Sequence, residues 1–192
     1  HLPSAAITLE TADKHPLSTF DGQTLISQFG PRYRLLLIGA GQLSAALARI
    51  AQSLDFAVSV CDPREEHVAE WNVANTQLLR SMPDDAVRDW QPDPRSAVVV
   101  LTHDPRLDDL ALLEALKSPA FYIAALGSRS NNQARRERLA LFDLTAAQIA
   151  RLYGPAGLFI GSRAPAEIAL SIAAQLVAVK NGLGRDTLID TG

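Results

Sequence analysis

The chain has 192 residues, 47% of them apolar and 20% charged, and its 18 basic and 21 acidic residues give a formal net charge of −3 at pH 7. This composition suits one domain with a proper core and flanking segments, whereas two full domains would be cramped. The balanced charge excludes the strong net positive charge that is typical of a protein that binds nucleic acid or an anionic membrane. No apolar segment approaches the roughly 20 residues of a membrane span.

The single cysteine, Cys61, rules out an internal disulfide framework and a multi-cysteine zinc site, so we expect no metal site built by the chain itself. No signal-peptide pattern opens the sequence, and one cysteine is compatible with a reducing compartment, so we expect a cytoplasmic protein. Residues 1–33 carry scattered apolar residues, prolines and glycines without sustained periodicity. We therefore expect residues 1–30 to be an N-terminal extension or linker, such as the tail of an absent upstream domain, and residues 31–192 to form the folded domain.

A strand, a glycine turn and a helix are predicted from residue 34 onward. Residues 35–38 form an apolar run too short for a helix, which is typical of a strand buried in a parallel sheet. Gly39 and Gly41 then break the run. The residues that follow at spacings of four, three and four predict one buried helix face, formed by Leu43, Leu47, Ile50 and Leu54.

This glycine turn is typical of a site where a phosphate approaches the backbone at the positive N-terminus of a helix. The third glycine of the G-x-G-x-x-G fingerprint is replaced by Ser44, which is small enough for close helix packing. The second strand, residues 56–61, ends at Asp62, which follows Gly41 by 21 residues, about where dinucleotide folds place an acid that binds ribose. Arg64 nearby would instead favour a 2′-phosphate.

The middle of the chain predicts a short helix at residues 65–71, a brief strand at 76–79 and a surface excursion at 82–94, which is acidic and broken by prolines. A clear strand at 97–101 is followed by a helix running from 105 to about 117, with Asp104 as its N-cap and a proline at its first position.

His103 lies between that strand and its helix, which places it at the ligand-binding edge of the sheet. We expect it to form a hydrogen bond to a ligand or to stabilise the turn, rather than to ligate a metal alone.

A further strand is predicted at residues 121–126, followed by a turn at Gly127, Ser128 and Arg129 and by a solvated helix over 130–138. A short helix follows at 145–151, with Thr145 as its cap. A second Gly-Ser-Arg turn at 161–163 precedes the last helix, whose predicted buried face consists of Ile168, Ile172, Leu176 and Val179.

Strands and helices thus alternate, which predicts an α/β fold of the Rossmann type: an open, mostly parallel sheet with helices on both faces. The polar turns all follow the carboxyl ends of strands, the edge where such folds bind ligands. Backbone N–H groups at the glycine turn and at the two Gly-Ser-Arg turns would be suited to an anion.

Several turns in this order resemble those of one known family, the C-terminal Rossmann-like domain of the XdhC/CoxI family. The shared stretches are Gly39-Ala-Gly41, Cys61-Asp-Pro-Arg64, Val100–Pro105 with Leu107-Asp-Asp109, Tyr122–Arg129, and Gly157–Gly161 with Ala164–Ala169. Members of the family are accessory proteins of xanthine dehydrogenase and other molybdenum hydroxylases. The resemblance implies a maturation chaperone that binds the molybdenum cofactor, a pterin dithiolene carrying a phosphate or a nucleotide, and helps its sulfuration and insertion into the apo-enzyme.

The implied partners are an apo molybdenum hydroxylase, a cysteine desulfurase and a second copy of the chain in a homodimer. Gln42 stands where the family commonly has a histidine, and the family's N-terminal domain, which brings cysteine chemistry, has little counterpart here. The resemblance therefore supports cofactor binding more firmly than sulfur transfer. We also expect Cys61 to be a core residue rather than a sulfur carrier, because it ends a buried strand.

No catalytic residue is assigned. The predicted cofactor-binding residues are Gly39, Gly41, Gln42, Asp62, His103, Gly127, Ser128, Arg129, Gly161 and Ser162. Two other functions remain open: an NAD(P)-dependent oxidoreductase, supported by the glycine turn and Asp62, and a nucleotide-sensing regulatory module. Against the oxidoreductase, the sequence has no Tyr-x-x-x-Lys pair.

Overall fold

A computed structural model of the chain describes residues 18–20, 25–27 and 33–184. The chain divides into two compact units, residues 1–31 and 32–192. In the first unit, β1 (Ser18–Phe20) pairs antiparallel with β2 (Leu25–Ser27). Most of the extension predicted at residues 1–30 lies outside the described residues.

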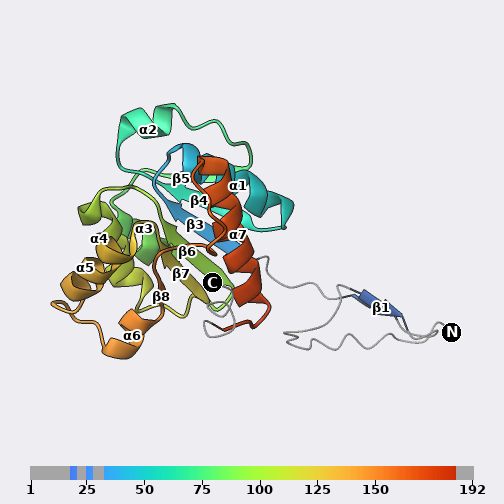
Figure 1. Cartoon of the computed structure of the whole chain (residues 1–192). Helices are drawn as coiled ribbons and strands as arrows, with labels where there is room; N and C mark the ends of the chain where they lie inside the picture. The colour runs from blue at the N-terminus through green and yellow to red at the C-terminus, as the bar shows by residue number, and fades with distance from the viewer. Residues whose placement is uncertain (1–17, 21–24, 28–32, 185–192) are drawn as a thin grey trace. The chain divides into compact units, whose positions relative to one another are not determined.

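The second unit is built on a six-stranded sheet in which every neighbouring pair of strands is parallel (Figure 1). Its strand order is β5-β4-β3-β6-β7-β8, so the chain first builds one half of the sheet outward and then returns to the middle to build the other. This is the order of a Rossmann fold, and the predicted fold class is confirmed. The strands are β3 (Arg34–Ile38), β4 (Ala57–Cys61), β5 (Thr76–Leu79), β6 (Ser96–Val100), β7 (Tyr122–Ala125) and β8 (Leu152–Tyr153).

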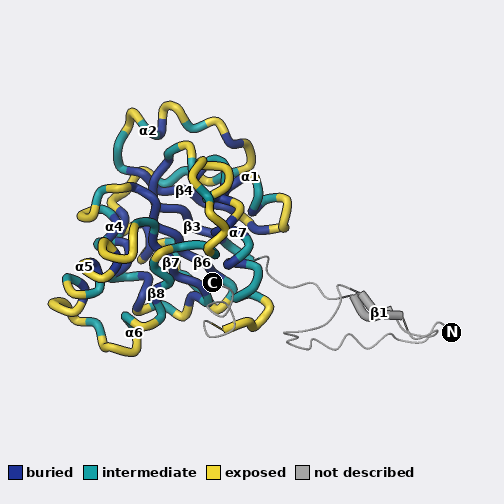
Figure 2. Tube along the Cα trace, viewed as in Figure 1, coloured by how far each residue is buried: buried dark blue, intermediate teal, exposed yellow. Residues whose placement is uncertain are grey.

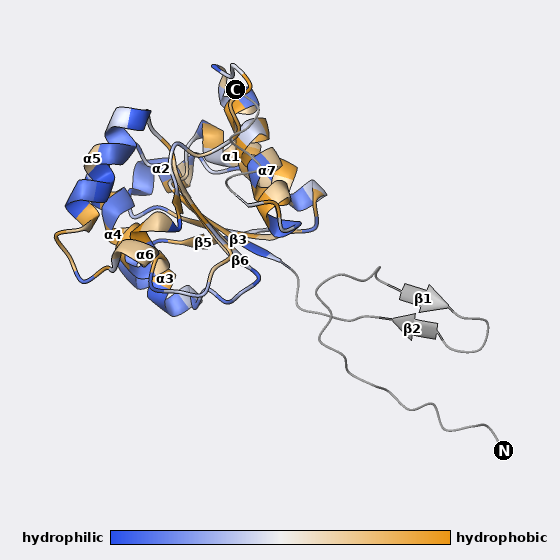
Figure 3. Cartoon of the chain, turned by 60° about the horizontal axis from the view of Figure 1, so that its bottom comes forward, coloured by the Kyte–Doolittle hydropathy of each residue, from blue (hydrophilic) through white to orange (hydrophobic). Residues whose placement is uncertain are grey.

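Helices cover both faces of this sheet (Figure 3). They are α1 (Gln42–Ser53), α2 (Glu65–Ala69), α3 (Pro83–Trp90), α4 (Pro105–Ala115), α5 (Arg129–Leu139), α6 (Ala146–Ala150) and α7 (Pro165–Lys180). The first and last of these seven, α1 and α7, pack together on one face, and α3 packs against α4 on the other. Within the described ranges, no helix is both long enough and apolar enough to cross a membrane.

The centre of the sheet is buried on both sides (Figure 2). Along β3, Leu35 and Leu37 join the core beneath α1 and α7, while Leu36 and Ile38 join the core beneath α3 and α4. Side chains of a strand alternate between faces, so a strand covered on both faces must be apolar throughout. The continuous apolar run at residues 35–38 therefore predicted its position correctly.

Helix termini also follow the predicted chemistry. The Asp104 carboxylate accepts a hydrogen bond from Arg106 N at 2.9 Å and caps α4, which begins at Pro105. Thr145 and Gln148 form a reciprocal capping box at the start of α6. Both predicted caps are confirmed.

The prediction of a surface excursion at residues 82–94 is wrong, because helix α3 occupies Pro83–Trp90 and packs against the sheet. Its proline stands at the first helical position, where a missing N–H costs nothing. Only three residues of this helix, Pro83, Ala86 and Val87, are buried, so its apolar stripe is too narrow to stand out in an acidic sequence.

Two finer predictions also need correction, and one strand was missed. The helix predicted at residues 130–138 forms as α5, but it is not wholly solvated, because Asn132 and Arg135 are buried. Leu54 does not belong to the buried face of α1, since it is the C-cap residue and is 38% exposed. The edge strand β8 was not predicted, because its two residues are too few to produce an alternating pattern.

Candidate functional site

A pocket of about 260 Å³ opens at the carboxyl edge of the sheet, beside the point where the strand order reverses between β3 and β6. Open α/β sheets bind ligands at this place. The pocket is lined by residues 41–44 after β3, Arg64 and His67 after β4, residues 101–103 after β6, and Pro165. The structure thus brings together three of the predicted site residues, which are Gly41, Gln42 and His103.

Helix α1 presents uncapped N–H groups to this pocket. Its N-cap is Gly41, no side chain caps it, and its first turn contains no acidic residue. Asp104 caps α4, Ser128 caps α5, and the Glu167 carboxylate accepts bonds from the N–H groups that precede α7, whereas α2 and α3, like α1, have no side-chain cap. The first N–H groups of a helix have no partner within it and lie at its positive end, so the start of α1 is suited to an anion.

Ser44 lies in the first turn of the same helix. It is 1% exposed, lines the pocket, and its hydroxyl has no hydrogen-bond partner among the described residues. A buried hydroxyl without a partner costs about 1–3 kcal/mol. This residue occupies the third position of the glycine fingerprint, and because its side chain is buried, it serves the close packing of the helix at that position.

Gly39 and Gly41 have different tasks. Gly39 has φ +108°, and a Cβ there would lie 3.1 Å from both Cα and N of Thr102, so this glycine allows two neighbouring turns to approach each other. Gly41 has φ −91°, and a Cβ there would meet nothing within 4 Å. Gly39 therefore shapes the wall of the pocket, and Gly41 leaves open space at its surface.

Asp62 lies behind the glycine turn and is fully buried. Its carboxylate accepts hydrogen bonds from Ala40 N at 2.8 Å and from Arg64 N at 3.1 Å. It also accepts hydrogen bonds from the Arg64 side-chain atoms Nε and Nη2, each at 2.8 Å. Burial alone would raise the pKa of Asp62, but the hydrogen bonds from Arg64 and Ala40 outweigh it and lower that pKa. The ionised pair fixes the Arg64 guanidinium at the pocket wall.

His103 is exposed at the pocket and has φ +63°, a left-handed conformation that non-glycine residues rarely adopt. Its neighbours hold the turn: Thr102 Oγ1 accepts a hydrogen bond from Asp104 N at 3.0 Å and donates one to Asp108 Oδ1 at 2.7 Å. Such strain, of about 1–3 kcal/mol, persists only where surrounding contacts enforce it.

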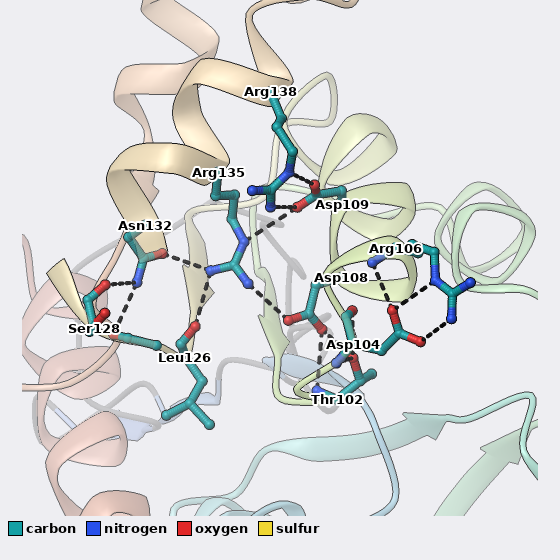
Figure 4. A network of polar contacts seen from close by, with 11 residues as sticks. Thr102, Asp104, Arg106, Asp108, Asp109, Leu126, Ser128, Asn132, Arg135 and Arg138 are labelled. Carbon is teal, nitrogen blue, oxygen red and sulfur yellow. Dashed lines mark hydrogen bonds and ion pairs between the residues drawn. The ribbon is translucent and has the colours of Figure 1, made fainter. Parts of the chain in front are cut away.

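A buried polar network supports this turn (Figure 4). Asp108 accepts bonds from both N and Oγ1 of Thr102, and its second oxygen lies 3.0 Å from Arg135 Nη2. Arg135 Nη1 donates to Leu126 O at 3.0 Å and to Asn132 Oδ1 at 2.8 Å. Burial raises the pKa of Asp108, while the Thr102 hydrogen bonds and the Arg135 charge oppose that rise. The network thus joins the turn after β6 to the turn after β7.

The remaining predicted site residues lie outside the lining of this pocket. Gly127 has φ +129°, and Arg129 is exposed. The Ser128 hydroxyl caps α5 by accepting a hydrogen bond from Asn131 N. Gly161 has φ +73° and, with Ser162, belongs to the loop that leads to α7. Their role in binding stays a prediction.

Sequence reasoning missed His67, which lies in α2 with Nδ1 4.0 Å from Asp62 Oδ2 and lines the pocket. Its position in a helix that begins at the carboxyl edge was the available signal. Among the residues that the structure describes, no group of three or more His, Cys, Asp or Glu side chains is arranged to hold a metal ion.

Cys61 is a buried core residue, as predicted. Its thiol lies 3.4 Å from Ser81 O, and burial, together with the negative charges of Asp62 and Asp84, raises its pKa to about 12. The nucleophile in thiol chemistry is the thiolate, so we expect the folded protein to resist a thiol-specific disulfide reagent at pH 8 and to react fully in denaturant. Absorbance of the released thiol measures both rates, and rapid reaction without denaturant would contradict this assignment.

Comparison with known proteins places the chain in a family. A family model described as the XdhC Rossmann domain matches residues 35–176. The chain is 35% identical over 160 residues to an Escherichia coli protein named uncharacterized protein YqeB, covering 81% of this chain and 29% of that one. It is 30% identical over 167 residues to a Bacillus subtilis protein named as a probable xanthine dehydrogenase subunit, covering 85% of this chain and 48% of that one.

A crystal structure from Bacillus halodurans described as a xanthine dehydrogenase superposes with a TM-score of 0.69 at 28% identity, covering 85% of this chain and 46% of that chain. The chain thus spans less than half the length of these relatives. The fold is that of a Rossmann-type α/β domain with a pocket at the carboxyl edge of its sheet. The chain belongs to the XdhC family, and the predicted resemblance is confirmed.

Proposed function

We propose that this domain is an accessory factor that holds the molybdenum cofactor for an apo molybdenum hydroxylase of the xanthine dehydrogenase type and helps its maturation. Family membership and the names of the relatives support the general role. The observation that supports cofactor binding is the pocket at the start of α1, where uncapped N–H groups and the side chain of Arg64 line the same space.

The pocket residues fit an anionic ligand that carries a heterocycle. The N–H groups of residues 42–44 and the Arg64 guanidinium would hold negative charge. Gln42, His67 and His103 would supply hydrogen bonds to the polar edge of a pterin. When bound, the cofactor would supply the molybdenum and dithiolene chemistry that the hydroxylase uses, while the residues of this chain bind and orient it.

Three further elements belong to the proposal. The turns at 127–129 and 161–162 would extend the site beyond the pocket. A cysteine desulfurase would be a second partner, and the domain would act as a homodimer in the cytoplasm. Because Cys61 is buried, sulfur would come from such a partner rather than from this chain.

Cofactor retention tests the proposed function. The protein, joined to any upstream domain and produced in cells that make the molybdenum cofactor, would be purified under anaerobic, reducing conditions. Elemental analysis and mass spectrometry of released small molecules should then find molybdenum and a pterin in proportion to protein. Purified protein that carries neither would count against the proposal.

The variant Gly41→Ala makes this test specific to the pocket. Its Cβ meets no protein atom within 4 Å and φ is ordinary for alanine, so the fold should be unchanged. The added methyl would occupy ligand space beside the helix start, and we expect cofactor retention to fall about tenfold or more, the loss expected from a misplaced phosphate contact. Gly184→Ala is the matched control, because its Cβ also meets nothing within 4 Å and it lies outside the pocket lining. Equal retention by the two variants would overturn the assignment of the pocket.

The strand order favours one alternative, a nicotinamide-dependent oxidoreductase, because dinucleotides bind across the same edge of Rossmann folds. Fluorescence titration with reduced nicotinamide nucleotides, followed by a substrate screen, separates the two functions. Tight binding with turnover would favour the oxidoreductase. A nucleotide-sensing module would instead change its oligomeric size when nucleotide is added.

A further inference from the structure

His103 differs in its location from the other described residues that have a side chain and a positive φ, which are Asp55, Asn75 and Gln91. Asp55 and Gln91 lie at the ends of α1 and α3, where a left-handed residue commonly terminates a helix, and Asn75 directly precedes β5. Of these four, His103 is the one that follows the end of a strand and lines the pocket. Its left-handed backbone is thus a feature of the ligand edge.

The imidazole of His103 contributes no polar contact that would stabilise this conformation. The side chain is exposed, and it forms no hydrogen bond or ion pair with the other described residues. A left-handed backbone is unfavourable for a residue with a side chain, and it persists only where surrounding contacts enforce it. The contacts that hold His103 must therefore come from the residues on either side of it.

Asp108 supplies these contacts. It is 1% exposed, and its Oδ1 accepts hydrogen bonds from Thr102 N at 3.2 Å and from the Thr102 hydroxyl at 2.7 Å. The same hydroxyl accepts a hydrogen bond from Asp104 N at 3.0 Å. One carboxylate thus fixes the residue before His103 directly and the residue after it through the hydroxyl (Figure 4). Arg135 in turn holds the second oxygen of Asp108 at 3.0 Å.

Asp108 does not line the pocket, so it acts on a ligand through the turn that it holds. We propose that Asp108 is a positioning residue, which keeps His103 in the left-handed conformation and thereby presents the imidazole to the ligand before binding. A side chain that is ordered in advance loses less conformational freedom when the ligand binds, which raises affinity. This role rests on the proposed function for the identity of the ligand, whereas the conformation of His103 is a property of the unliganded chain.

The unliganded protein tests whether Asp108 enforces the conformation. Glycine adopts a positive φ without penalty and alanine does not, so His103→Gly should have a higher urea midpoint than His103→Ala. In an Asp108→Asn background the turn relaxes, and this order should disappear or reverse, because glycine gains more freedom than alanine in the unfolded chain. A carboxylate that only stabilises the fold would lower both midpoints equally. A glycine advantage that is absent in the parent background, or that survives Asp108→Asn, would overturn the proposal.

Thr102→Val takes the place of Asp108→Asn if that variant does not fold. It removes the hydroxyl that links Asp108 to Asp104 N and keeps the shape of the side chain, whereas Thr102→Ser retains the hydroxyl. The glycine advantage at position 103 should therefore be smaller with Thr102→Val than with Thr102→Ser. Equal advantages in the two backgrounds would overturn the proposal.

Molybdenum retained by anaerobically purified protein tests whether the turn serves the ligand. His103→Ala should lower the molybdenum content about tenfold, the effect of losing one hydrogen bond, and Asp108→Asn should lower it by a similar factor. The double variant should retain no less than either single variant, because Asp108 acts through His103. Asp109→Asn is the control, since this neighbouring carboxylate bonds Arg138 and not Thr102, and it should retain molybdenum as the parent does. Parent-like retention by Asp108→Asn, or a further loss in the double variant, would overturn the proposal.

The two proposals fail separately. A parent protein that carries no molybdenum would count against the proposed function, while the order of the glycine and alanine midpoints still decides whether Asp108 holds His103. Molybdenum retention that is unaffected by His103→Ala would leave the proposed function standing and overturn the positioning role.

Discussion

Replacement of Gly39 by alanine is expected to lower the free energy of unfolding by about 2–5 kcal/mol, because two costs add. The residue has φ +108°, which a side chain makes unfavourable, and the new Cβ would press on Cα and N of Thr102 at 3.1 Å. Those contacts are backbone atoms, which cannot rotate away. Relief would require the turn after β3 to separate from the turn after β6, so the pocket should loosen as well.

Urea unfolding monitored by circular dichroism measures this loss, and Gly41→Ala two residues away is the control. The second variant has an ordinary φ and free space, so its stability should match that of the parent within about 0.5 kcal/mol. A parent-like midpoint for Gly39→Ala would contradict the close approach of the two turns.

Arg135→Met is expected to cost about 3–5 kcal/mol, because it leaves the buried Asp108 carboxylate without its ion-pair partner. The guanidinium also joins Leu126 O and Asn132, so the turn after β7 should lose order together with the turn at Thr102 (Figure 4). Urea unfolding gives the loss. Amide hydrogen exchange at the two turns tests whether they loosen together.

The neighbouring Arg138→Met provides the contrast. Arg138 also pairs with an aspartate, Asp109, at 2.7 Å, but its side chain is 42% exposed, and an exposed pair of this kind contributes about 0.2–1 kcal/mol. Adding Asp108→Asn to Arg135→Met should recover part of the lost stability, since the stranded charge is then removed. Equal losses for the two arginine variants would contradict the role of burial.

Local pattern predicted the parts of the fold that depend on local chemistry. The apolar run at residues 35–38 identified a central strand, because a strand covered on both faces must be apolar throughout. Asp104 and Thr145 identified helix starts, because a capping side chain acts within two or three residues of its own position. Helix α3 was not predicted, because its proline is also typical of a loop and only three of its residues are buried.

The candidate site was predictable as an edge of the sheet but not as an arrangement of contacts. The spacing of Asp62 from the glycine turn indicated a ribose-binding acid, while the structure shows that carboxylate buried and bonded to Arg64, only two residues away. Arg135 belongs to a very polar helix, so its burial follows from Asp108 on α4, 27 residues earlier in the chain. Neither pairing leaves a periodic signal in the sequence.

The location of molybdenum in the protein tests the proposed cofactor site most directly. Crystals of protein loaded anaerobically with the molybdenum cofactor would be measured on both sides of the molybdenum absorption edge, so that anomalous scattering places the metal. We expect a single peak beside the pocket formed by Gly41–Ser44, Arg64 and His103, and no such peak in Gly41→Ala. A stoichiometric peak elsewhere on the domain, or one that survives Gly41→Ala unchanged, would contradict the assignment of this pocket.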